Sequence, residues 1–165
     1  MIVISDTTPI ISLMKISQLE LLEKYFGEIQ IPNAVYKELT TNSRFESEAE
    51  KLKEASFIHV IEIEDDEAVT ILQKVTGLDL GESEAIILAD IKKADLLLMD
   101  EAKGREVAKK LGIKIMGTVG LLMASYEAQN ISADEIELCI TSLRKSGRHI
   151  GEKYYHMLLE KIGKE

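Results

Sequence analysis

The sequence predicts an α/β fold in which helices pack around a mostly parallel sheet of four or five strands. Short aliphatic and β-branched runs alternate along the chain with longer stretches of helical periodicity, the pattern of consecutive βαβ units. One run, residues 96–99, is continuously apolar, as is typical of a parallel strand buried on both faces. The chain has 165 residues, of which 45% are hydrophobic, so we expect one domain over residues 1–165 with a substantial core.

Five short segments carry the strand pattern. Residues 2–5 and 29–31 are compact aliphatic runs, and residues 57–63 alternate apolar with polar side chains. The buried run of residues 96–99 follows, and residues 113–116 form the last short strand. The acidic stretch of residues 62–67 is predicted to be a solvated loop and the start of a helix.

Glycine and proline mark the expected helix boundaries. We expect Pro9 and Pro32 to open helices, because proline suits the first helical turn, and Gly27 and Gly112 to end helices. Gly81 is expected to lie just before a strongly apolar helix. The further predicted helices cover residues 46–55, 82–93 and 101–111, and three more follow Gly117 as far as residues 129, 146 and 162. Residues from about 131 to 165 then form a C-terminal helical extension.

Composition excludes several classes of protein. The 20 Lys and Arg against 29 Asp and Glu give a net charge of -9, which argues against a protein that coats nucleic acid with a basic surface. A nuclease with an acidic metal pocket is compatible with this charge. Cys139 is the single cysteine, so we expect neither an internal disulfide nor a structural zinc site, and the cytoplasm is the expected compartment. The sequence shows no standard export signal or membrane span, so we expect no membrane partner.

Two acids follow directly after predicted strands. Asp6 ends the first strand and Asp100 ends the buried strand of residues 96–99. Ligands of open α/β sheets bind outside the carboxyl ends of the strands, so both carboxylates are expected at one site. Two carboxylates held close together imply either a raised pKa or a cation between them. Their oxygen-only chemistry favours Mg²⁺ or Mn²⁺ over zinc.

Further acids lie on helices expected to begin near that edge. Glu82 and Glu84 leave their helix about 200° apart, so at most one of them is expected to face the site. Glu38 lies on the helix that follows the second strand. Each acid taken alone is better explained as a helix N-terminal charge or a solvated residue than as a functional group. The joint placement of Asp6 and Asp100 is what indicates a site.

Four blocks of the sequence resemble the PIN-domain ribonucleases, and in particular prokaryotic PIN proteins similar to the toxins of toxin–antitoxin pairs. The blocks are Ile4-Ser5-Asp6-Thr7-Thr8-Pro9, Ile31-Pro32-Asn33-Ala34-Val35-Tyr36-Lys37-Glu38-Leu39, Gly81-Glu82-Ser83-Glu84-Ala85-Ile86 and Leu98-Met99-Asp100-Glu101. The resemblance covers nearly the whole chain, including the C-terminal helices. It implies a three-layer α/β/α PIN-like domain.

The resemblance also implies catalytic roles for four acids, namely Asp6, Glu38, Glu82 and Asp100. Asp6, Glu82 and Asp100 correspond to metal ligands for Mg²⁺ or Mn²⁺, and Glu38 to the acid that orients or deprotonates water. Glu82 lies 18 positions before Asp100 (100 − 82), which fits the family spacing better than Glu84 does. The chain departs from the family by using Glu where Asp is common at the third acid, and by Leu98-Met99 where a Thr often precedes the fourth.

The implied activity is metal-dependent endoribonuclease cleavage of RNA phosphodiester bonds by an activated water. Thr7 is implied to support Asp6, and Glu84, Thr118, Lys103 and Arg105 are further candidates for lining the site or contacting RNA. The implied partners are an RNA substrate, a small antitoxin protein and a second copy of the chain in a homodimer. The alternatives are a catalytically inactive PIN-like module that binds RNA or protein, and a Mg²⁺-dependent phosphatase or nucleotide-binding protein. The phosphatase reading is disfavoured because Thr8 stands where that class usually has a second Asp.

Overall fold

Five parallel strands form the central sheet of the computed structural model, within the described residues 1–147 and 151–163. They are β1 (Val3–Ser5), β2 (Ile29–Pro32), β3 (Ile58–Ile61), β4 (Leu96–Leu98) and β5 (Ile115–Met116), arranged in the order β3-β2-β1-β4-β5. Every neighbouring pair is parallel. The predicted α/β class with a mostly parallel sheet is therefore confirmed.

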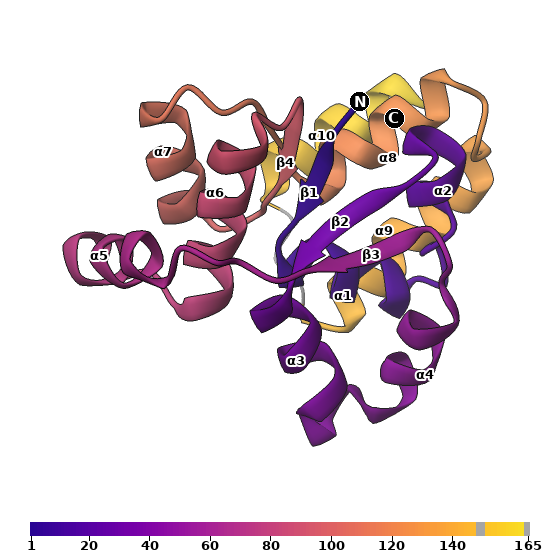
Figure 1. Cartoon of the computed structure of the whole chain (residues 1–165). Coiled ribbons are helices and arrows are strands. Elements are labelled where there is room, and N and C mark those ends of the chain that lie inside the picture. The colour runs from indigo at the N-terminus through magenta and orange to yellow at the C-terminus, as the bar shows by residue number, and fades with distance from the viewer. Residues whose placement is uncertain (148–150, 164–165) are drawn as a thin grey trace.

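Helices cover both faces of this sheet and complete three layers (Figure 1). One face packs on α5 (Asp66–Thr76), α6 (Leu80–Lys92) and α7 (Ala102–Lys110). The other packs on α1 (Thr7–Lys15), α2 (Leu21–Phe26), α8 (Thr118–Glu127), α9 (Ala133–Lys145) and α10 (Glu152–Lys161). Between β2 and β3 the chain forms α3 (Asn33–Thr41), the short 3-10 helix η1 (Ser43–Phe45) and α4 (Glu46–Glu54).

The period-two pattern of the inner strands divides the core in two. Val3 and Leu98 pack with α1 and α8 in the larger cluster, whereas Ile4, Leu97 and Met99 pack with α6 and α7 in the smaller one. All five side chains are buried. Successive side chains of a strand point to opposite faces, so a sheet buried on both sides needs apolar residues at every position.

Several predicted boundaries were wrong by a few residues. Helix α1 begins at Thr7 rather than Pro9, and Pro32 ends β2 instead of opening α3. Strand β3 is shorter than residues 57–63, because it lies at the edge of the sheet and pairs only with β2. Gly81 lies inside α6, since Asp79 is the residue that caps this helix.

Helix α5 was not anticipated as a complete helix, because the acidic run that precedes it indicates a loop. The side chain of Asp65 caps it by accepting a hydrogen bond from the Ala68 amide at 3.1 Å. Only Val69 is fully buried on this helix, and Ile71 and Val75 are exposed. The apolar residues of this helix nevertheless recur at helical spacing (Ala68, Ile71, Leu72 and Val75), so the sequence did carry a signal for it.

The strand order places β1 at the centre of the sheet, between β2 and β4. The backbone N–H of Asp6 donates to the carbonyl of Leu98 at 3.0 Å, which extends the β1–β4 pairing to the edge where both strands end. Asp6 and Asp100 therefore leave adjacent strands at the same edge of the sheet, as the sequence predicts.

The described part of the predicted C-terminal extension consists of α9 and α10. Ile136, Ile140 and Leu158 from these helices are buried in the larger core cluster. Residues 148–150 and 164–165 of the predicted extension lie outside the described residues. Among the described helices, none combines the length and apolar character needed to cross a bilayer. Cys139 is a buried free thiol on α9.

Candidate acidic metal site

Asp6 is the buried centre of the candidate site. It follows β1 directly and is the N-cap residue of α1, so its backbone is fixed by the sheet on one side and the helix on the other. Its exposed fraction is only 3%. A carboxylate this well buried is rare without a compensating charge or hydrogen bonds.

Three other acids lie close enough to influence Asp6. The pKa of Asp6 is raised to about 7, mainly by burial and in addition by the charges of Glu82, Asp79 and Glu38, against a lowering by the Thr7 backbone N–H. Burial also raises the pKa of Glu82, with Asp79, Glu101 and Glu38 contributing in the same direction. Perturbed acids of this kind cluster at functional sites, because structural acids are ordinarily paired or solvated.

Gly81 brings the helix-borne acids together over the end of the sheet. A Cβ atom at this position would lie 3.4 Å from Oε2 of Glu38 and 3.6 Å from both Oδ1 of Asp79 and Oγ1 of Thr7. The Thr7 hydroxyl donates to Oε2 of Glu38 at 2.9 Å. Side chains from α1, α3 and the start of α6 thus converge around one small residue.

Asp79 is a member of this cluster that the sequence interpretation missed. It forms a capping box with Glu82: the Glu82 amide donates to Oδ1 of Asp79 at 2.8 Å, and the Asp79 amide donates to Oε2 of Glu82 at 2.9 Å. The signal was present as Asp79-Leu80-Gly81-Glu82, an acid at the N-cap followed three residues later by Glu. The box orients Glu82 as well as beginning α6.

Replacing Asp79 by Asn is expected to separate these two roles. Asn caps helices about as well as Asp, so Asp79→Asn should change the free energy of unfolding by less than roughly 0.5 kcal/mol, whereas Asp79→Ala should lose about 1 kcal/mol. Both variants should lower the pKa of Asp6, because one repelling charge is removed. Urea unfolding and an NMR titration of Asp6 measure the two effects.

The matched control is Asp65→Asn, at the N-cap of α5. It has the same capping chemistry but is not among the groups that raise the Asp6 pKa. An equal change in the Asp6 pKa in the Asp65 and Asp79 variants would contradict the assignment of Asp79 to the cluster.

Asp100 is held by the N-terminus of α8. Its Oδ1 accepts from the Thr118 amide and its Oδ2 from the Thr118 hydroxyl, each at 2.7 Å. Gly117 allows this close approach, since a Cβ there would lie 2.8 Å from Oδ1 of Asp100. Thr118 therefore lies against the fourth predicted acid and fixes its orientation.

The remaining candidates lie in different surroundings. Nη1 of Arg105 donates to the Met99 carbonyl at 2.8 Å, which ties α7 to the end of β4. Nζ of Lys103 would lie 3.1 Å from a Cβ at Gly77, beside the turn that leads to Asp79. Glu84 points to α3, where its Oε2 accepts from the Ala34 amide at 2.9 Å. Of the two alternatives for the third acid, the structure brings Glu82 and not Glu84 to Asp6.

The donor set fits a hard divalent cation. All the converging groups are carboxylate or hydroxyl oxygens, which Mg²⁺ and Mn²⁺ prefer. A cation beside Asp6 would offset the burial and repulsion that raise its pKa. Among the described residues, no three acids stand together at ligand spacing, and both oxygens of Asp100 are bonded to Thr118. Each oxygen of Asp100 accepts one hydrogen bond and keeps a lone pair with which it could bind a cation.

Comparison with known proteins identifies the fold family. A family model described as a PIN domain matches residues 2–164. The chain belongs to the PIN-domain family. This PIN domain therefore has a nuclease-type function at the level of its family, whose members generally use divalent metal ions and act on RNA. No curated protein sequence matches the chain.

Proposed function

We propose that this PIN domain is a Mg²⁺- or Mn²⁺-dependent endoribonuclease whose site consists of Asp6, Glu38, Glu82 and Asp100. The observation that carries the proposal is the buried Asp6, against which Glu82, Asp79 and Glu38 place their charges. A packed domain gains no stability from collecting four acids in this way, because each adds repulsion. Cation binding accounts for the arrangement.

Asp6, Glu82 and Asp100 would hold the metal, which when bound lowers the pKa of water and neutralises charge that develops on the phosphate. Glu38 is exposed, so it is open to substrate and solvent while the Thr7 hydroxyl holds its Oε2. It would orient or deprotonate the attacking water. Thr118 keeps Asp100 at the end of β4, and the capping box with Asp79 restricts the orientation of Glu82.

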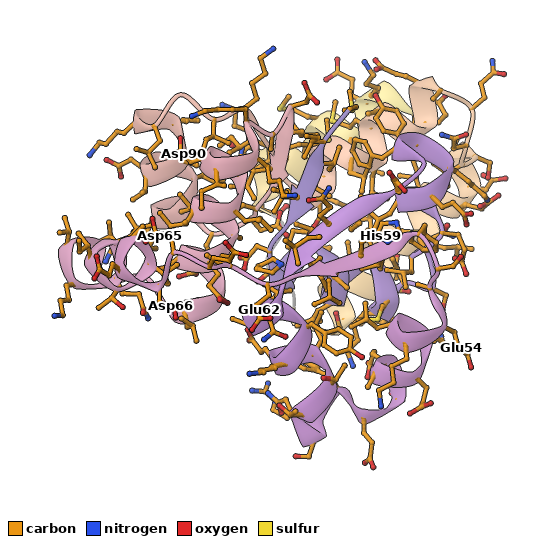
Figure 2. All side chains as sticks on the ribbon, in the orientation of Figure 1. Glu54, His59, Glu62, Asp65, Asp66 and Asp90 are labelled. Carbon is orange, nitrogen blue, oxygen red and sulfur yellow. The ribbon has the colours of Figure 1, made fainter. Side chains whose placement is uncertain are left out.

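Calorimetric titration of Mn²⁺ into the wild type, Asp6→Asn and Asp100→Asn, with RNA cleavage assayed on the same samples, tests this function. We expect each substitution to weaken metal binding at least about tenfold and to reduce cleavage roughly a hundredfold or more. Asp90→Asn is the matched control, because Asp90 lies toward the other end of α6, away from the site (Figure 2), and should behave as the wild type.

A folded wild type that binds no metal would overturn the proposed activity. The inactive PIN-like module that binds RNA or protein would then be the favoured alternative. Retained cleavage in Asp6→Asn would equally contradict the site.

The same proposal extends to a biological role as the toxin of a toxin–antitoxin pair, supported by the sequence resemblance of the four acidic blocks and the C-terminal helices. Induced expression of the wild type is expected to arrest growth of a bacterial host, and Asp6→Asn at equal protein levels is expected to be harmless. Equal toxicity of the two proteins would contradict this role.

A further inference from the structure

Helix α3 begins without a cap from its own sequence. Pro32 occupies the N-cap position and makes no side-chain hydrogen bond, so the first amides of the helix depend on other segments. Glu84 supplies a partner from α6, with its Oε2 accepting from the Ala34 amide at 2.9 Å across 50 residues of sequence. This contact joins two helices rather than closing a local turn.

The same two helices meet again at Glu38 and Gly81. Ala34 and Glu38 are one turn apart on α3, and Gly81 and Glu84 are one turn apart on α6, so each pair lies on a common face of its helix. Oε2 of Glu38 would lie 3.4 Å from a Cβ on Gly81. The Glu84 hydrogen bond and the approach of Glu38 to Gly81 are thus two contacts between α3 and α6, one helical turn apart.

We propose that Glu84 is a positioning residue for the nuclease site, fixing the start of α3 on α6 so that Glu38 lies beside Thr7 and Asp79. The inference rests on the proposed function, in which Glu38 acts on the attacking water. Glu84 works through the Ala34 amide and the first turn of α3, and it makes no contact with substrate or metal.

The surroundings of Glu84 agree with this role. Burial raises its pKa, and the Ala34 N–H and Lys37 counteract that effect, whereas Asp66 and Glu62 add to it. Glu62, Asp65 and Asp66 lie on the segment that runs from the end of β3 to the start of α5 (Figure 2). The positive N-terminal end of α3 stabilises the charged form of this half-buried carboxylate against the repulsion of the neighbouring acids.

Two substitutions separate the hydrogen bond from the charge. Glu84→Gln keeps an oxygen that accepts from the Ala34 amide, whereas Glu84→Ala removes the acceptor. Glu62→Gln is the matched control, since it removes a neighbouring charge without touching the hydrogen bond. Amide hydrogen exchange and backbone NMR shifts, measured without metal, report on α3 directly.

In Glu84→Ala we expect exchange at Ala34 to accelerate roughly tenfold or more, with shifted resonances for Thr7 and Glu38, while Glu84→Gln and Glu62→Gln resemble the wild type. Unmoved Thr7 and Glu38 resonances in Glu84→Ala would overturn the inference. This arm needs neither metal nor RNA, so it decides the inference even if the wild type proves unable to cleave.

Kinetics then distinguish positioning from ligation. We expect Glu84→Ala to lower kcat about tenfold in the wild type but less than about twofold in a Glu38→Gln background, because both substitutions act through the same group. Mn²⁺ affinity should stay within about twofold of the wild type in Glu84→Gln. Equal losses of kcat in both backgrounds, or a tenfold loss of Mn²⁺ affinity in Glu84→Gln, would overturn the assignment.

Discussion

Replacing Asp6 by Asn is expected to stabilise the metal-free protein at neutral and alkaline pH while abolishing metal binding. The buried Asp6 carboxyl has a pKa of about 7 in the folded protein, against 3.8 for an ordinary Asp. The folded state therefore holds a proton that the unfolded state has lost between these two values. The contribution of Asp6 to the stability of the wild type therefore falls as the pH rises from about 4 to 7, and then levels off.

The size of the effect follows from the pKa difference. Each pKa unit corresponds to 1.36 kcal/mol, so the full destabilisation has a ceiling of roughly 4 kcal/mol above pH 7. Asn carries no titrating group, although its amide is still buried. We expect the advantage of Asp6→Asn over the wild type in unfolding free energy to grow by about 2 to 3 kcal/mol as the pH rises from 5 to 8.

Urea unfolding at several pH values, with a chelator present, measures this difference. Saturating Mn²⁺ should remove it, because a ligand that binds only the folded wild type stabilises that protein and not the variant. If the free energies of unfolding of the two proteins changed with pH in the same way, the raised pKa of the buried Asp6 carboxyl would be contradicted.

Gly117→Ala is expected to produce the second large effect, by displacing Asp100 from its position at the end of β4. The added Cβ would lie 2.8 Å from Oδ1 of Asp100, so close that one of the two groups must shift, and 3.0 Å from Nη1 of Arg105, which is a tight contact. Gly117 has φ −96° and ψ 178°, which any residue adopts, so the glycine is needed for space and not for backbone conformation.

We expect this substitution to destabilise the fold by about 1 to 2 kcal/mol and to weaken Mn²⁺ binding about tenfold, with a larger loss of RNA cleavage. Calorimetry, thermal unfolding and cleavage assays on one preparation give the three values. Gly151→Ala serves as the control, because among the described residues its Cβ would meet the Tyr154 ring alone, at 3.5 Å or more. Metal binding at wild-type strength in Gly117→Ala would show that the position of Asp100 is unimportant.

Local sequence patterns predicted the strands of the sheet and the acids that directly follow two of them, because each of these features depends on a few consecutive residues. The apolar runs of β1 and β4 had to be buried, and the acid after each run had to lie at the carboxyl edge. The alternation of strands and helices fixed the α/β class in the same way. The bounds of edge strand β3 were harder to predict, because partial burial at the edge of the sheet weakens the alternation on which such predictions depend.

Partners distant in sequence account for what could not be predicted within the candidate site. The family spacing favoured Glu82 over Glu84, but the partner of Glu84 could not be predicted: Glu82 accepts from the nearby Asp79 amide, whereas Glu84 accepts from the distant Ala34 amide. No periodicity encodes the contact of Glu84 with α3. Asp79 was within reach of local reasoning, since its capping box is a four-residue motif, but it gained its relation to Asp6 only through the fold.

The central position of β1 also governs when the site is complete during synthesis. Asp6 belongs to the first strand made, but its neighbour β4 and the Thr118 contact to Asp100 come from residues about a hundred positions later. A nascent chain that ends before α8 lacks the hydrogen bonds that orient Asp100. Strand order therefore makes the completion of the candidate site depend on residues from both halves of the chain.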